Sequence, residues 1–133
     1  MKIELDWLKE YVDINSSELG HILTMGGLEV ESVEWVALPD GRKTEVMELN
    51  VTPNRGYCLS FIGVAREVAG LLNRRLSAPV IEEKIGTAPV AEKVSAVNEE
   101  AKLCPRYSAM VVENVSVGPS PKWLADRLIA VGL

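Results

Sequence analysis

Residues Asn50 to Asn73 read N-V-T-P-N-R-G-Y-C-L-S-F-I-G-V-A-R-E-V-A-G-L-L-N and combine a stiff turn with a strongly apolar segment. Apolar residues recur at spacings of three and four from Leu59 to Leu72, which predicts a helix with a stripe that faces a core. Further apolar residues widen the stripe until little of the circumference is polar. Other elements normally surround such a helix, so we predict that it is the central core helix.

The turn before this helix contains Thr52, Pro53 and Asn54. Pro53 lacks a donor for a β-ladder and biases Thr52 towards extended geometry, so it ends the preceding strand. Asn54 is placed to cap the core helix by accepting a backbone N–H.

Arginines accompany the turn and the helix. Arg55 and Arg66 lie eleven positions apart, close to three helical turns, and are predicted to share a face. We expect Glu67, the next residue, to be an internal ion-pair partner for Arg66. Two interpretations remain open. The arginines tie the helix to acidic residues of the same fold, or they join Arg74 and Arg75 in contacting RNA or a partner subunit.

The composition indicates a globular chain with an aliphatic core. Of the 133 residues, 47% are hydrophobic, but the aromatic ones are only three Trp, three Tyr and one Phe. This length suits one compact domain, or a small domain with part of another. No run approaches the roughly 20 apolar residues that cross a bilayer, and the charged N-terminus lacks a secretory signal. We expect a cytoplasmic protein without a membrane partner.

The net charge of −5 is unevenly distributed. Residues 1–40 carry two basic and nine acidic side chains, whereas residues 41–80 carry six basic and three acidic ones. An acidic balance argues against a free-standing nucleic-acid binder, because such affinity comes mainly from neutralising phosphates. The basic middle third is the exception to this acidic balance. Its simplest explanation is that it pairs with the acidic first third of the same fold.

Few side chains are suited to catalysis or metal binding. His21 is the only histidine, and Cys58 and Cys104 are the only cysteines, which is too few for a recognisable zinc site. We expect two reduced, packed thiols and a surface or packing role for His21. The sequence contains no glycine-rich phosphate loop and no nucleophile motif. It therefore predicts no catalytic, cofactor-binding or metal-binding residue.

The chain before residue 28 predicts two helices. Apolar spacing predicts the first over residues 5–12 and the second over residues 16–25. The sequence N-S-S-E at residues 15–18 is a capping-box pattern for the second helix, and Gly26 and Gly27 end it.

Residues 28–51 predict a β-hairpin. Alternating apolar residues indicate strands over 28–36 and 44–51, with a change of buried face partway along the first. The P-D-G sequence at 39–41 supplies the turn between them.

The second half of the chain is less regular. Residues 74–89 are predicted to be a connector, followed by strands over 90–97 and 107–117. Ser120 is a cap and Pro121 the first residue of a final helix. The inner face of this helix is predicted to carry Trp123, Leu124, Arg127, Leu128 and Val131.

Five segments stand out together. They are M-K-I-E-L-D-W-L-K-E-Y-V at residues 1–12, L-T-M-G-G-L-E-V-E at 23–31, L-N-V-T-P-N-R-G-Y-C-L-S-F-I-G-V-A-R-E at 49–67, C-P-R-Y at 104–107 and P-S-P-K-W-L-A-D-R-L at 119–128. In this order they resemble the beginning of the beta subunit of bacterial-type phenylalanyl-tRNA synthetase. The segment at 49–67 contains the most specific part of this resemblance. Its structural family motif consists of Thr52, Pro53, Asn54, Arg55 and Glu67.

The resemblance implies a parent phenylalanine–tRNA ligase, an α2β2 tetramer that uses ATP and magnesium to join phenylalanine to tRNA(Phe). In that family the alpha subunit carries the catalytic site. The beta subunit supplies scaffold, tRNA contacts and a domain that hydrolyses mischarged Tyr-tRNA. ATP and magnesium are expected to bind elsewhere in the parent, so no cofactor is expected on this segment.

The chain itself is expected to be an inactive structural segment that supports aminoacylation, with the alpha subunit as partner and tRNA(Phe) bound through the parent enzyme. The alternative is a stand-alone nucleic-acid-binding module that uses the region of Arg55, Arg66, Arg74 and Arg75.

The resemblance also implies an α+β fold in two parts. Residues 1–76 match a small winged-helix-like, nucleic-acid-binding domain of three helices and a β-hairpin. Residues 77–89 form a linker, and residues 90–133 match the incomplete start of an α/β editing domain. The end at Leu133 is therefore expected to be a truncation.

Two features depart from the family pattern. The family usually inserts an OB-type tRNA-binding domain where Ala37–Lys43 forms a short turn here. It also commonly has Asp where this chain has Tyr57. With Asn54 as the cap, a carboxylate at that position would complete a capping box, so its loss is expected to weaken the helix start by about 1 kcal/mol or less.

Overall fold

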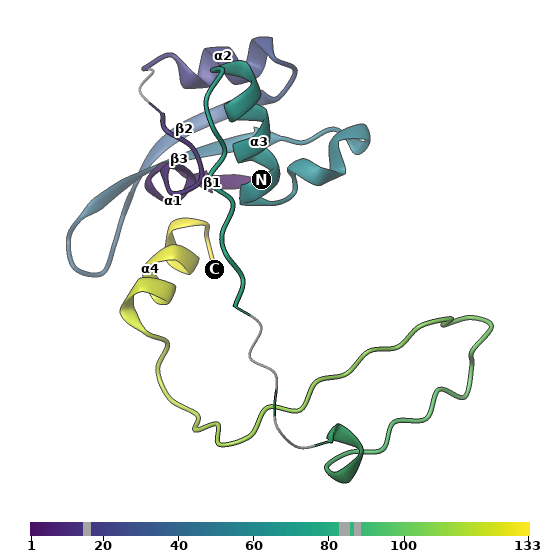
Figure 1. Cartoon of the computed structure of the whole chain (residues 1–133). Helices are drawn as coiled ribbons and strands as arrows, with labels where there is room; N and C mark the ends of the chain where they lie inside the picture. Colours follow the sequence, from purple (N-terminus) through teal and green to yellow (C-terminus); the bar gives the residue numbers. More distant parts are fainter. Residues whose placement is uncertain (15–16, 83–85, 87–88) are drawn as a thin grey trace. The chain divides into compact units, whose positions relative to one another are not determined.

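The computed structural model describes residues 1–14, 17–82, 86 and 89–133. It divides into two units, of which the first joins Met1–Val80 to Ser120–Leu133 and the second is Ile81–Pro119 (Figure 1). The predicted capping box begins at Asn15 and Ser16, which lie outside the described residues. The domain boundaries predicted from the sequence stay a prediction.

A three-stranded antiparallel sheet lies at the centre of the first unit, in the strand order β1-β3-β2. β2 (Glu29–Ala37) and β3 (Lys43–Asn50) form the predicted hairpin, which is confirmed. The sequence does not predict β1 (Lys2–Glu4), which pairs with β3 and places Ile3 opposite Met47. Three residues are too few for a periodic signal, and this strand exists only because a distant segment pairs with it.

A β-bulge moves the buried side of β2. The pairing with β3 shifts between Val30, which lies opposite Leu49, and Ser32. An extra residue in one strand puts Val30 and Val33 on the same side of the sheet, although they are three positions apart. Val30 packs against the main core, whereas Val36 packs against a second apolar cluster, and this confirms the predicted change of buried face along the strand.

Three helices pack with the sheet around one aliphatic core: α1 (Leu5–Lys9), α2 (Leu19–Met25) and α3 (Phe61–Leu71). α1 is shorter than predicted, and the carboxylate of Glu4 caps it by accepting the N–H groups of Asp6 and Trp7. α3 is confirmed as the core helix. Its completely buried residues are Val64, Ala65 and Val68.

The start of α3 differs from the prediction. Pro53, Asn54 and Arg55 belong to a separate 3-10 helix, η1 (Pro53–Cys58), and α3 begins only at Phe61. Ser60 has extended geometry and caps α3, since its Oγ accepts the N–H of Gly63 at 3.1 Å. The prediction that Asn54 caps the core helix is therefore wrong. Tyr57 lies before the helix, so its expected effect on the helix start is wrong as well.

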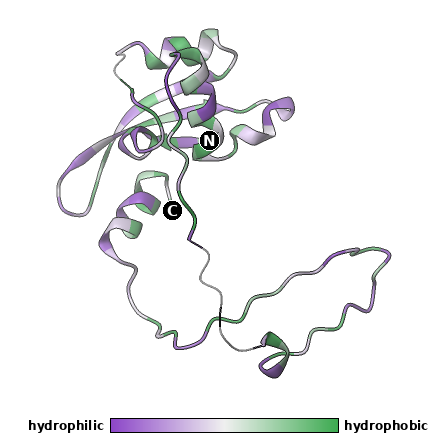
Figure 2. Cartoon of the chain, in the orientation of Figure 1, coloured by the Kyte–Doolittle hydropathy of each residue, from purple (hydrophilic) through white to green (hydrophobic). Residues whose placement is uncertain are grey.

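The second unit is largely irregular. Its one regular element in the described residues is a 3-10 turn, η2 (Val90–Glu92), and Lys93 pairs with Glu113 at 3.0 Å. The predicted strands over 90–97 and 107–117 are wrong, because the described residues provide no neighbouring strand to complete a ladder. Figure 2 shows hydrophobic and hydrophilic residues mixed along this segment.

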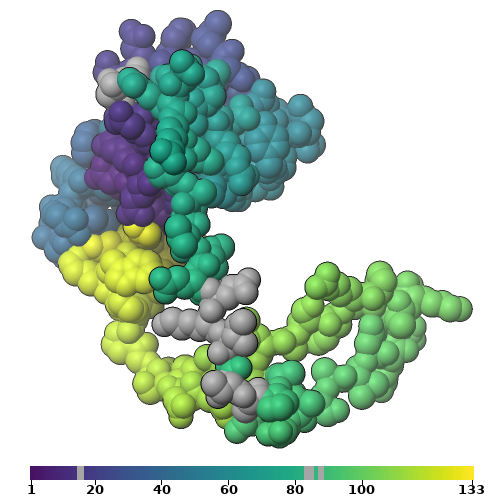
Figure 3. Space-filling view, in the orientation of Figure 1, coloured from purple at the N-terminus to yellow at the C-terminus, as the bar shows by residue number. Residues whose placement is uncertain are grey.

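The final helix, α4 (Lys122–Ala130), belongs to the first unit. It packs against the hairpin through a second apolar cluster, and Figure 3 shows it (yellow) against the hairpin (blue). The members of this cluster are Leu38, Val46 and Ala130, with Val36 and Ile129 beside them.

Two details of α4 were predicted incorrectly. Pro121 precedes the helix and no side chain caps it, so Ser120 is not a cap. The most buried residue is Ala130, at 2% exposed, whereas Trp123 is 61% exposed and not on the inner face. The apolar contact with the sheet is therefore made by the last turn of the helix, where a small residue allows close approach.

Candidate functional site

The family-motif residues form a compact cluster that joins η1 to α3. The Arg55 guanidinium donates from Nη1 to Oε2 of Glu67 at 3.0 Å and from Nη2 to the carbonyl of Gly26 at 3.2 Å. Tyr57 donates its hydroxyl to Oε1 of Glu67 at 2.8 Å. Nearby, Thr52 donates its hydroxyl to Oδ1 of Asn54 at 2.7 Å. These contacts hold the turn, the end of α2 and the middle of α3 together.

The predicted pair of Arg66 with Glu67 is wrong. Consecutive residues of a helix point in directions about 100° apart, so they do not face each other. Glu67 instead faces η1, where it meets Arg55. Arg55 is thus paired inside the fold, with a residue of α3 and not with the acidic first third.

Arg66, Arg74 and Arg75 are exposed, unlike Arg55. None of the three forms an ion pair within the part of the chain that the structure describes. The structure therefore divides the four predicted contact residues into one structural arginine and three that face solvent.

The hydrogen bond to Glu67 raises the pKa of the Tyr57 hydroxyl above its usual value. The folded state therefore favours the protonated phenol. The stabilising effect of this hydrogen bond is complete below the unfolded pKa of about 10 and is lost as the pH rises through the folded pKa of Tyr57. We expect the ultraviolet titration of Tyr57, obtained by subtracting a Tyr57→Phe variant, to have its midpoint above that of free tyrosine.

Replacing Glu67 by Gln removes the carboxylate, so this midpoint should return towards the usual value. An unchanged Tyr57 midpoint in the Glu67→Gln variant would contradict the assignment of the cause.

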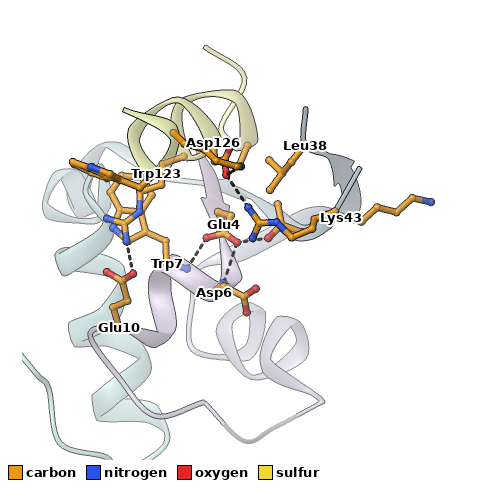
Figure 4. Close-up of a pocket in the computed structure, with 13 residues that line it drawn as sticks. Glu4, Asp6, Trp7, Glu10, Leu38, Lys43, Trp123 and Asp126 are labelled. Atoms are coloured by element: carbon orange, nitrogen blue, oxygen red, sulfur yellow. Dashed lines mark hydrogen bonds and ion pairs between the residues drawn. The ribbon is translucent and has the colours of Figure 1, made fainter. Parts of the chain in front are cut away.

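A cleft of about 750 Å³ opens between α1, the end of the hairpin and α4 (Figure 4). An aromatic and cationic stack forms one side of it. The Trp7 ring stacks on Phe61 with centroids 3.8 Å apart, and the Arg127 guanidinium lies 4.8 Å from the centroid of Trp7 and 5.5 Å from that of Trp123. Glu10 also pairs with Arg127. These contacts join α4 to α1.

The rim of the cleft is a network of alternating charges. Arg42 contacts Asp40 at 2.7 Å and Asp126 at 2.8 Å, and Lys122 contacts the same two carboxylates at 2.8 and 2.6 Å. A hydrogen bond from Lys122, which has the largest effect, and hydrogen bonds from Arg42 hold the pKa of Asp40 well below its usual range. Both cations thus have carboxylate partners within the fold.

The remaining polar groups of the cleft are also engaged or point elsewhere. Thr44 donates its hydroxyl to the buried Glu4, which at the same time caps α1. Lys43 extends away from the cleft in Figure 4. These contacts of the cleft are satisfied within the fold and hold α4.

Side chains suited to covalent or metal chemistry are not gathered together. Cys58 and Cys104 are free thiols, and burial raises the pKa of the Cys58 thiol, which makes it a poor nucleophile. His21 is exposed, as predicted. Among the described residues, no three His, Cys, Asp or Glu side chains cluster in a way that could hold a metal ion. None of the described helices has the length and apolar character needed to cross a bilayer.

The chain is similar along its length to curated beta subunits of phenylalanine–tRNA ligase. The subunit from Rhodopirellula baltica is 43% identical over 135 residues, which cover 100% of this chain and 19% of the relative. The chloroplastic subunit from Porphyra purpurea is 35% identical over 137 residues, or 99% of this chain and 18% of the relative. The subunit from Geobacter sulfurreducens is 45% identical over 70% of this chain and 12% of its own length. No family model matches the chain.

The chain therefore spans less than a fifth of the length of these relatives. A match over 135 residues that covers this whole chain leaves no room for an inserted domain in the Rhodopirellula segment. The short turn between β2 and β3 is thus shared with a natural relative.

Proposed function

We propose that this chain, which belongs to the phenylalanine–tRNA ligase beta-subunit family, is a structural segment that supports assembly of the aminoacylating enzyme. Similarity over the whole chain carries this proposal. In the proposed parent, a catalytic alpha subunit is the partner, and the α2β2 tetramer charges tRNA(Phe) with ATP and magnesium bound outside this segment. The segment on its own neither aminoacylates nor edits, and the parent works in the cytoplasm.

The site geometry supports a structural role. The family motif is occupied by contacts within the fold, since Arg55 and Glu67 bind each other and Arg55 also binds the carbonyl of Gly26. The cleft beneath α4 is likewise lined by side chains that form internal ion pairs and ring contacts. As finer parts of the proposal, residues 1–76 act as a winged-helix-like domain and residues 90–133 begin an editing domain.

A chimeric beta subunit tests the proposal. The counterpart segment in the Rhodopirellula baltica subunit is replaced by this chain, and the chimera is co-expressed with the matching alpha subunit. We expect an assembled complex that charges tRNA(Phe) at a rate close to that of the natural enzyme. The isolated 133-residue chain should neither charge tRNA nor deacylate Tyr-tRNA(Phe). Failure of the chimera to assemble, or deacylation by the isolated chain, would contradict the proposal.

A second function is favoured by one observation. Arg66, Arg74 and Arg75 are exposed and form no ion pair among the described residues. They are the candidates for a stand-alone nucleic-acid contact, in which Arg55 takes no part because it is held by Glu67.

Filter binding of tRNA distinguishes the two functions. A binder that uses three arginines would show micromolar affinity and a log–log salt slope of up to about −3. Replacing all three by Ala would remove this affinity, whereas replacing the exposed Lys102 and Arg106 would not. The structural segment should show no binding at about 0.1 M salt.

A further inference from the structure

β2 is an edge strand with large apolar side chains on its surface. In the order β1-β3-β2 it pairs with β3 alone. Trp35 is 66% exposed and Val33 is 50% exposed. They lie two positions apart, so both face the same side of the sheet. Exposed aromatic residues are typical anchors of protein interfaces, and an unpaired edge is a template for another strand.

The available part of this edge begins after the bulge. At the start of the strand, the N–H of Val30 donates to Oγ1 of Thr24 at 3.1 Å, so α2 covers the edge there. From Ser32 to Ala37, β2 is paired with β3, and no other element of the described structure forms a backbone hydrogen bond with it. One ladder of donors and acceptors therefore remains open beside Val33 and Trp35.

The charge of β2 has a single sign. Glu29, Glu31 and Glu34 are all exposed, and the strand carries no cationic side chain. Glu29 accepts from Asn50 at 3.0 Å, whereas Glu31 and Glu34 form no ion pair among the described residues. Glu34 points to the opposite side of the sheet from its neighbours Val33 and Trp35. On the open edge, Val33 and Trp35 thus lie on one side of the sheet and the carboxylate of Glu34 lies on the other.

We propose that residues Ser32–Ala37 of β2 dock an extended basic segment of another polypeptide, which adds to the sheet as a fourth strand. Its apolar side chains lie beside Val33 and Trp35, and its Lys or Arg side chains lie beside Glu34. The partner sequence therefore alternates basic and apolar residues. This docking depends on neither tRNA binding nor assembly of a ligase.

A second copy of the chain fits this edge less well. Two β2 strands side by side would bring six carboxylates together without a cation, which opposes self-pairing. If glutamates were the only feature of this edge, their role would be to protect an edge strand from aggregation. A protective edge has no need of an exposed Trp35, which is the feature that favours a specific partner.

Fluorescence anisotropy with a labelled nine-residue peptide of alternating lysine and valine tests the docking. At about 0.05 M NaCl we expect saturable binding to the full chain. A peptide of alternating glutamate and valine should bind at least about tenfold more weakly. N-methylation of alternate amides removes the ladder hydrogen bonds and should weaken the lysine peptide by about tenfold or more.

Matched variants locate the site. Trp35→Ser should weaken binding at least about fivefold, whereas Trp123→Ser, at a residue that is 61% exposed, should change it less than about twofold. Glu34→Lys should weaken binding more than Glu99→Lys, although both alter the net charge equally. Circular dichroism confirms that each variant is folded.

Three results would overturn the proposal. The first is no binding at about 1 mM peptide. The second is binding that survives both N-methylation and Trp35→Ser, since this would be unspecific attraction to an acidic chain. The third is a dimer in sedimentation that Trp35→Ser disperses, which would make a second copy the occupant of the edge.

Discussion

Replacing Gly63 by Ala is expected to unfold or severely destabilise the first unit. A Cβ at this position would lie 1.8 Å from the carbonyl oxygen of Tyr57 and 2.7 Å from its carbonyl carbon. These are backbone atoms of η1, so no flexible side chain can move aside. The first turn of α3 would have to separate from η1, which breaks the cap from Ser60. We expect a loss of more than about 3 kcal/mol in the free energy of unfolding.

Gly70 provides the control within the same helix. A Cβ there meets nothing within 4 Å, so Gly70→Ala should leave the fold intact and stabilise α3 by up to about 1 kcal/mol. Urea unfolding followed by circular dichroism measures both variants. If Gly63→Ala remained within about 0.5 kcal/mol of the unmodified chain, the close contact between η1 and α3 would be refuted.

Replacing Ala130 by Asp is expected to release α4 from the sheet while the main core stays folded. Ala130 is 2% exposed and contacts Leu38 and Val46 in the smaller apolar cluster. Burying a carboxylate there without a partner would cost several kcal/mol. Detaching a nine-residue helix costs less, because it is held by a few apolar contacts, by rim ion pairs and by the contacts of Arg127 with Trp7 and Glu10. The variant should therefore expose the cluster and bury no charge.

Hydrogen exchange distinguishes release of α4 from global unfolding. Amides of α4 should exchange at least about tenfold faster in Ala130→Asp, while those of α3 keep their protection. Ala125→Asp is the matched control, because this half-buried position lies outside the apolar cluster and one turn from Lys122. Equal loss of protection in α3 and α4 would show that α4 is an integral part of the main core.

The sequence predicts the elements whose signals are local. The hairpin follows from alternation and a P-D-G turn, and α3 follows from its apolar periodicity, so both are confirmed. β1 is missed because its three residues form a strand only through pairing with β3. The opposite error affects residues 107–117, where alternation gives strand propensity but the described residues supply no partner strand.

The start of α3 shows how two local signals compete. Asn54 after a proline is a good candidate cap, but Ser60 is an equally good one and lies nearer the apolar run. Arg55 has a non-helical conformation, which interrupts η1 well before α3 begins and leaves Ser60 as the cap. The pairing of Arg55 with Glu67 depends on this interruption, so it was not visible from the sequence.

Contacts between remote segments explain the rest of what was missed. Arg127 meets Trp7 and Glu10 although most of the chain lies between them. Its sequence neighbours indicate only an amphipathic helix. Which surface that helix covers is decided by the apolar patch at Leu38 and Val46, and by the carboxylate of Asp40 at the hairpin turn.

The position of α4 late in the chain has a consequence for synthesis on the ribosome. Val46 is made early, whereas Ala130, which covers it, is made only after the whole segment Ile81–Pro119. At about 5 to 20 residues per second, the roughly 40 residues of that segment take about 2 to 8 seconds to translate. During this interval one face of the nascent sheet packs against three helices, whereas the other exposes Leu38 and Val46. A nascent-chain chaperone would find its binding surface on that uncovered face.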